Sequence, residues 1–232
     1  MASAARIQAA DAALRRVFPE VTDAQRVVIL AHAMQEAQFG DAFQTPDGSS
    51  AYNWGAIYTK GDRGTLPRTD TDPAGKRIAV GAAWNSSDDV GARQLIGILR
   101  TSYPDALPAA ARGSWYDYSR ALWRDGPSYP GHVSKRPSWY VGFPPGHPYG
   151  LTPANVPIYS PLDFHWRIVA YARFVRGGGG AVMRALGIAP ALDNSEPPPP
   201  AAEPPNSRVS TAGGGALAAG LILWSLWKVL RS

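Results

Sequence analysis

The sequence contains no cysteine. Disulfide bonds and thiolate metal ligands are therefore excluded, and the sequence gives no indication of whether the protein works in an oxidising or a reducing compartment. Histidine is also rare, and its four positions show neither an HExxH motif nor another metal-ligand spacing: His32, His132, His147 and His165. We therefore expect no metal ion and no cofactor.

Charged residues make up only 18% of the 232 residues, and no run of lysines and arginines is interleaved with aromatic rings. This scattering argues against nucleic-acid binding. The net charge of +5 nevertheless favours contact with polyanions, among them anionic lipid and the acidic bacterial wall. Eight tryptophans and ten tyrosines are a high load for one core, so some of these rings are candidates for a sugar-binding cleft or a membrane interface.

The N-terminal residues lack the continuous apolar run of a signal peptide. Residues 4–17 instead have the periodicity of an amphipathic helix. In the next helix, Thr22 followed by Gln25 forms a capping-box pattern, and the residues up to about Gln38 are apolar nearly all round. Such a helix is expected to lie buried within the domain and to end at Gly40.

The composition from residue 41 to residue 83 predicts loops with a small β-hairpin. Further helices are predicted over residues 86–102, 114–124 and 160–176, with the irregular segment 127–161 before the last of them. The four glycines at 177–180 are expected to end that last helix, and a short helix over 181–186 to close the domain. The predicted fold class is therefore mainly α, with an α+β character from the hairpin.

The C-terminal part of the chain changes in composition. Residues 1–188 form the predicted folded domain, and the proline-rich residues 189–210 predict a stiff, extended linker. Residues 211–230 are apolar over about the ~20 residues that cross a bilayer, which predicts one transmembrane helix. Tryptophans, Lys228 and Arg231 near its end resemble an interfacial belt, and its glycines allow self-association between helices. A packed or amphipathic tail helix is the alternative, against which the linker argues.

Glu36 is the first candidate for chemistry, because it lies in the last turn of an apolar helix. Burial disfavours the ionised carboxylate and raises its pKa, and the negative end of the helix dipole acts in the same direction. We therefore expect a carboxyl group that stays protonated near neutral pH, as the general acid of glycosidic bond cleavage must. The alternative is an ordinary polar residue facing water. His32, one turn earlier, either binds Glu36 or packs in the core.

Two segments around Glu36 carry a resemblance to a known family. They read AMQEAQFGD, which contains Glu36, and SSAYNWGAIYTKGD, which begins at Ser49. Together they resemble the flagellar-type and autolysin-type endo-β-N-acetylglucosaminidases of the lysozyme-like superfamily. In that family a helix ends in an ALES-x-(W/Y)-G-like motif with the catalytic Glu, which Glu36 matches, and a YN-(L/F)-FG-I-K-like segment follows. The flank of Glu36 differs in part, and Tyr58 stands where the family often has Lys.

The resemblance continues to Tyr129. The segment from Ile78, IAVGAAWNSSDDVGARQLIGILRTSYPDAL, is similar to the family's strand that leads into a helix, and WYDYSRALWRDGPSY is similar to the helix before a G-Y-A-T-D-P-like segment. Tyr129 then matches the cleft tyrosine of the family, although the T-D-P that should follow it is absent. The resemblance implies a cleft for glycan strands of peptidoglycan, bound by Tyr52, Asn53, Trp54, Gly55 and Tyr129.

Each of these residues also has a structural interpretation. The rings of Tyr52, Trp54 and Tyr129 either stack on sugars or pack in the core. Asn53 either hydrogen-bonds an acetamido group or braces its loop. Gly55 either lets the backbone approach the substrate or supplies a positive φ.

Cleavage of a glycosidic bond with inversion or retention needs a second group that activates water or stabilises the oxocarbenium ion. The resemblance places such an acidic residue in the β-region, where Asp70 and Asp72 lie, with Asp62 as a third candidate. The alternative is that these are solvated turn residues. If none of them reaches the cleft, a lytic transglycosylase with one acid/base and a 1,6-anhydro product is expected instead.

The expected function is hydrolysis of β-1,4 bonds in peptidoglycan by a membrane-anchored enzyme. A lytic transglycosylase or muramidase of the same fold, and an inert wall-binding module, are the alternatives. A structural or injection component of a phage particle is compatible with cleavage and needs no secretion signal.

The two ends of the predicted transmembrane helix give conflicting indications of its orientation. Two positive charges, Lys228 and Arg231, lie near its C-terminal end, and only Arg208 lies before it, so the positive-inside tendency predicts a cytoplasmic C-terminus and a domain outside. A chain without a signal peptide is instead expected to keep its domain inside. Delivery by a virion or a holin-like partner would remove that conflict.

Overall fold

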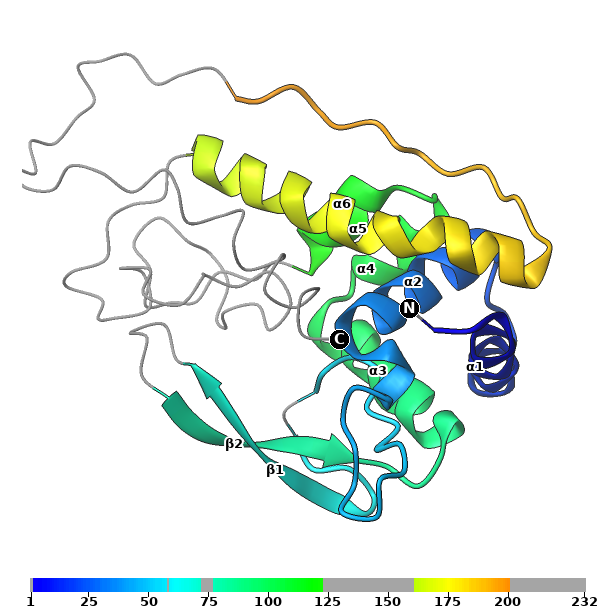
Figure 1. Cartoon of the computed structure of the whole chain (residues 1–232). Helices are drawn as coiled ribbons and strands as arrows, with labels where there is room; N and C mark the ends of the chain where they lie inside the picture. Colours follow the sequence, from blue (N-terminus) through cyan, green and yellow to red (C-terminus); the bar gives the residue numbers. More distant parts are fainter. Residues whose placement is uncertain (1, 58, 72–76, 123–160, 201–232) are drawn as a thin grey trace, which may run out of the picture. The chain divides into compact units, whose positions relative to one another are not determined.

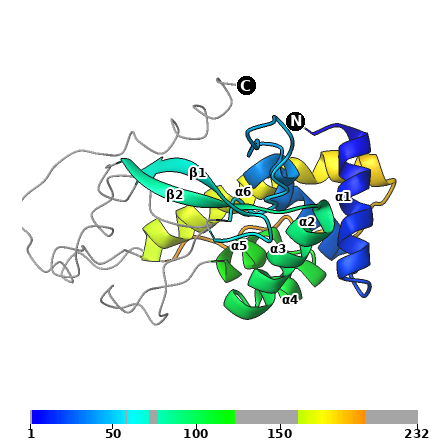
Figure 2. The same ribbon diagram turned by 90° about the horizontal axis from the view of Figure 1, so that it is seen from below.

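The computed structural model describes residues 2–57, 59–71, 77–122 and 161–200. The chain divides into two compact units, Met1–Pro200 and Ala201–Ser232, and every described residue belongs to the first. This unit is mainly helical and has a small two-stranded antiparallel sheet, as Figures 1 and 2 show from two sides. The predicted coarse fold class is therefore confirmed.

The first two helices form where the sequence predicts them. Helix α1 (Ala4–Val17) begins at Ser3, whose hydroxyl accepts a hydrogen bond from the backbone N–H of Arg6. Helix α2 (Asp23–Ala37) begins with the complete capping box, in which Thr22 and Gln25 each bind the other's backbone N–H. Because α2 packs against α1, α4 and α6, its residues from Val27 to Met34 are all buried.

The predicted hairpin consists of β1 (Gly64–Thr71) and β2 (Arg77–Trp84). The strands pair antiparallel, from Gly64 opposite Trp84 to Thr71 opposite Arg77. Figures 1 and 2 show the hairpin extending beside the helices, with one end next to the start of α3.

The described residues between the hairpin and residue 122 form three helices. Helix α3 (Asp88–Ser102) is capped by the Ser87 hydroxyl, which confirms the predicted helix start. Helix α5 (Trp115–Ala121) is capped by Ser114 and lies within the predicted 114–124 helix. The short helix α4 (Ala106–Ala111) between them was not predicted, because its six residues ALPAAA are too few to show a periodicity.

The prediction that the last helix ends at the four glycines is wrong. Helix α6 runs without a break from Pro161 to Leu186 and contains Gly177–Gly180. Glycine is unfavourable in a helix, but tertiary packing overrides this preference here. A Cβ at Gly178 would lie 2.8 Å from Met34 Cε and 3.3 Å from Ala31 Cα, so the missing side chains let α6 lie directly against α2.

The residues that follow α6 contact α5 and α6. The backbone N–H of Trp115 binds the carbonyl of Asp193, the N–H of Asp193 binds the carbonyl of Gly113, and Arg173 forms an ion pair with Glu196. The first residues of the predicted 189–210 linker therefore contact α5 and α6.

The described helices include none that is long and apolar enough to cross a membrane. The predicted transmembrane helix over residues 211–230 lies outside the described residues, as does most of the predicted irregular segment 127–161.

Candidate functional site

Glu36 is the last residue but one of α2, and its side chain is half-buried. The hydroxyl of Tyr171, from the middle of α6, donates a hydrogen bond of 2.9 Å to Glu36 Oε1. The sequence predicted the helix end and the burial around it, but not this partner. The carboxyl group is therefore held between the end of one helix and the side of another.

His32 lies one turn before Glu36 and is completely buried. Its Nδ1 lies 2.5 Å from the hydroxyl of Tyr118 in α5. The imidazole also meets two aromatic rings edge-on, with ring centroids 5.7 Å from Tyr118 and 6.4 Å from Tyr171. Burial lowers the pKa of His32 to about 3, so the ring is neutral at the pH values at which most enzymes work.

Tyr118 is the third member of this cluster and is fully buried. Burial, and then the negative charge of the nearby Glu36, raise the pKa of Tyr118 above its ordinary value. Its phenol therefore stays protonated. His32, Tyr118 and Tyr171 together offer neutral polar groups around Glu36, which is suited to a carboxyl group that must exchange a proton.

The turn directly after Glu36 has an unusual backbone. Gln38 and Phe39 adopt left-handed conformations with φ of 47° and 59°, and Gly40 follows with φ of 97°. A Cβ at Gly40 would lie 2.3 Å from the backbone nitrogen of Asn53. The end of α2 therefore lies directly on the Tyr52–Ile57 loop, where two more non-glycine residues have positive φ: Tyr52 and Ala56. Strained conformations of this kind concentrate at functional sites.

A network around Arg6 in α1 holds this turn in place. The Arg6 guanidinium donates to the carbonyl of Phe39 at 2.8 Å, to Asp41 at 2.9 Å and to both oxygens of Asp88 at 2.8 Å. Asp88 at the start of α3 also accepts a hydrogen bond of 2.8 Å from Trp54 Nε1. Helices α1 and α3, the turn after α2 and the Tyr52–Ile57 loop are thus joined by one set of charged hydrogen bonds.

Two of the predicted sugar-binding residues are buried within the protein. Trp54 has no exposed surface, and its ring packs edge-on against Phe39 with centroids 5.5 Å apart. Asn53 is also fully buried, donates to the carbonyl of Ile57 at 2.9 Å and accepts from its N–H at 2.7 Å. These contacts fit the structural interpretation of both residues, packing for the Trp54 ring and bracing of the loop for Asn53, and their contact with a sugar stays a prediction.

The other predicted binding residues differ in position. Tyr52 is half-buried in the loop that contacts Gly40, and its carbonyl accepts a hydrogen bond from Asn85. Gly55 is buried, and the positive φ angles of the loop fall on its neighbours Tyr52 and Ala56. Tyr129 lies outside the described residues.

The candidates for a second carboxylate lie in or near the hairpin. Asp70 is in β1, opposite Ile78, and Asp72 lies outside the described residues. Asp62 accepts hydrogen bonds from the backbone N–H and the hydroxyl of Ser86, at 2.8 Å and 2.6 Å. The Ser86 hydroxyl is the main cause that lowers the pKa of Asp62, so this carboxylate stabilises the turn before α3.

Sequence patterns could not reveal Tyr171 and Tyr118 as neighbours of Glu36. Both rings fit the apolar faces of their helices, and contacts between residues 82 to 135 positions apart depend on how the helices pack. The one available signal was the glycine run after Tyr171, since glycines within a helix often mark a close approach of another backbone.

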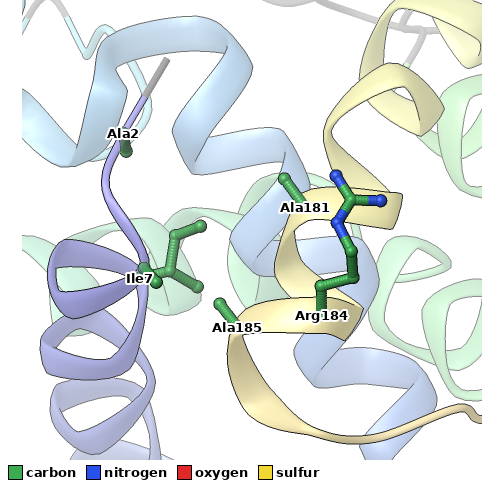
Figure 3. Close-up of a pocket in the computed structure, with 6 residues that line it drawn as sticks. Ala2, Ile7, Ala181, Arg184 and Ala185 are labelled. Carbon is green, nitrogen blue, oxygen red and sulfur yellow. The ribbon is translucent and has the colours of Figure 1, made fainter.

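No group of three or more potential metal ligands is found in the described part of the chain. One cavity, of about 220 Å³, lies between the start of α1 and the end of α6 (Figure 3). Its lining consists of small apolar side chains and one charged residue: Ala2, Ala4, Ile7, Ala181, Arg184 and Ala185. It shares no residue with the Glu36 cluster.

Comparisons of the chain with protein-family models, with curated proteins and with solved structures find no match. The fold and the Glu36 cluster are therefore the basis of the functional proposal, together with the resemblance of the motifs.

Proposed function

We propose that this chain cleaves the β-1,4 glycosidic bonds of peptidoglycan glycan strands, with Glu36 as the general acid, in a domain of the lysozyme-like type. The observation that carries the proposal is the state of Glu36: a half-buried carboxyl group at the end of a buried helix, bound by Tyr171 and beside two neutral polar rings. A mainly helical domain with a small β-hairpin is in accord with this fold type.

In the proposed reaction the protonated Glu36 transfers its proton to the bridging oxygen as the bond between that oxygen and C1 breaks. The oxocarbenium-like centre at C1 then takes up the oxygen of a water molecule, whose proton is removed by a base. The neutral rings of His32 and Tyr118 support the first step because, unlike a cation, they do not favour the carboxylate form of Glu36.

The remaining assignments complete this proposal. Asp70 or Asp72 would activate the water or stabilise the charge at C1, and Tyr52 and Tyr129 would contact the sugars. A single helix over residues 211–230 would anchor the enzyme in a membrane, with the cell wall as its site of action and a virion as one carrier.

The proposal is tested by digesting purified peptidoglycan with the full-length chain in a mild detergent. Glu36→Gln keeps the shape of the side chain but cannot donate the acidic proton. We expect muropeptide release to fall by about 10²–10⁴-fold, because this is the contribution of general acid catalysis. The matched control is Glu20→Gln, an exposed glutamate paired with Arg100, which should keep full activity.

Mass spectrometry of the products identifies the reaction. Reducing N-acetylglucosamine ends indicate a glucosaminidase, reducing N-acetylmuramic acid ends a muramidase, and 1,6-anhydro ends a transglycosylase. If the wild-type chain binds the wall and releases no muropeptides, the enzymatic proposal is wrong and the chain is a wall-binding module.

A further inference from the structure

Tyr171 has a fixed position against Glu36. The two residues are 135 positions apart in the sequence, yet the phenol lies 2.9 Å from Glu36 Oε1. The ring is held edge-on against His32, at an interplanar angle of 82°, and packs at a tilt against Phe174 with centroids 6.0 Å apart. Aromatic contacts on two sides leave the hydroxyl little freedom to point elsewhere.

The glycines of α6 bring Tyr171 to this position. Gly178 lies seven residues, or about two turns, after Tyr171 and therefore on the same face of the helix. A Cβ there would lie 2.8 Å from Met34 Cε, and a Cβ at Gly179 would lie 2.9 Å from the ring of Trp115. The close approach that these glycines permit lets the phenol reach Glu36; Figure 1 shows α6 crossing α2.

Two titratable groups of the described residues next to this hydrogen bond are neutral. His32 from α2 is uncharged because its burial lowers its pKa to about 3. Tyr118 from α5 stays protonated, and it contacts His32. The hydrogen bond from Tyr171 to Glu36 is therefore formed next to uncharged rings, where such a bond is stronger than in water.

We propose that Tyr171 is a positioning residue that controls the protonation of Glu36. A donor to a carboxylate stabilises its charged form, so Tyr171 opposes the effect of burial and sets the pH at which Glu36 loses its proton. It also occupies Oε1 as an acceptor, so the transferable proton of the neutral acid is on Oε2. The effect of Tyr171 on the protonation of Glu36 can be measured without catalysis. Only its effect on the reaction rate rests on the proposed function.

The first measurement is therefore independent of activity. The chain has only four glutamates, so the carboxyl carbon of each is resolvable in a ¹³C-glutamate-labelled sample: Glu20, Glu36, Glu196 and Glu203. The Glu36 signal is identified by its loss in Glu36→Gln. In Tyr171→Phe, we expect its titration midpoint to rise by about one pH unit, because the donor to the carboxylate is lost.

Two further proteins separate this effect from damage to the fold. Replacing Tyr171 with 3-fluorotyrosine keeps the shape and makes the phenol a stronger donor, so the midpoint should fall. Tyr116→Phe removes a buried phenol of α5 that lies 3.5 Å from His165, and it should leave the Glu36 midpoint unchanged. The fluorinated protein gives the answer even if Tyr171→Phe folds poorly.

The catalytic consequence is measured on peptidoglycan. For Tyr171→Phe we expect kcat to fall about tenfold with little change in KM. We also expect the alkaline limb of the pH profile of kcat/KM to move to higher pH. Unchanged midpoints in both Tyr171 proteins would overturn the inference even if the wild type is active. Shifted midpoints without any cleavage by the wild type would uphold the Tyr171–Glu36 coupling and refute the proposed function.

Discussion

At the scale of single residues, the candidate site is a carboxyl group that lies beside uncharged polar rings of the described residues. The sequence predicted a buried helix end at Glu36, and the structure adds that His32 is wholly buried one turn away. A histidine in this place could have held a positive charge against Glu36. Its contact with Tyr118 and its low pKa show that it acts as a neutral part of the packing.

The low pKa of His32 makes the stability of the domain sensitive to acid. The pKa is about 3 in the folded chain and 6.5 ordinarily, so between these values the unfolded chain binds a proton that the folded chain does not. The stability is present above about pH 6.5 and is lost progressively as the pH falls towards 3. We expect His32 to account for a loss on the order of 2 kcal/mol in the free energy of unfolding between pH 7 and pH 4.5.

Urea unfolding of the wild type and of His32→Gln at both pH values measures this contribution. The variant should be less stable at pH 7, because the hydrogen bond with Tyr118 is disturbed, but it should lose less stability on acidification. Equal acid-induced losses in the two proteins would mean that His32 is not the group that titrates.

At the scale of elements, the sequence predicted the helix starts well and the role of glycine poorly. The starts at Ser3, Thr22, Ser87 and Ser114 depend on local hydrogen bonds between residues three apart, which a pattern can show. The course of α6 through Gly177–Gly180 depends on α2, a distant segment, and local propensity pointed the other way. The same limit explains why sequence patterns left both a sugar contact and a packing role open for Trp54 and Asn53.

Helix α3 offers a matched pair of glycines that tests whether a close approach positions the site. A Cβ at Gly91 would lie 2.0 Å from the carbonyl oxygen of Tyr52 and 2.9 Å from Trp54 Cδ1, so the loop that contacts Gly40 must move. We expect Gly91→Ala to cost about 2 kcal/mol or more in the free energy of unfolding. A Cβ at Gly97 in the same helix would meet nothing within 4 Å, and Gly97→Ala should stabilise by about 0.5–1 kcal/mol.

Chemical denaturation of the two variants decides this prediction. Muropeptide release should fall in Gly91→Ala and stay at the wild-type level in Gly97→Ala, because only the first displaces the loop beside the end of α2. Stabilisation by both substitutions would show that the loop does not need the space at Gly91.

At the scale of the whole molecule, the chain joins a folded unit to a segment of different composition. The first unit ends at Pro200, and hydrogen bonds as far along as Glu196 attach its last residues to α5 and α6. The apolar run over 211–230 follows within the second unit, Ala201–Ser232. A net charge of +5 adds an attraction to anionic surfaces that does not depend on insertion.

Flotation with anionic liposomes separates these two modes of membrane contact. We expect the full-length chain to float with the vesicles even in about 1 M salt, because at that ionic strength the Debye length is only about 3 Å and electrostatic attachment is screened, whereas an inserted helix is retained. A chain that ends at Pro200 should stay with the soluble fraction at high salt, and its cleavage of dissolved glycan strands should match that of the full-length chain. If salt releases the full-length chain from the vesicles, residues 211–230 do not insert, and charge alone brings the protein to anionic surfaces.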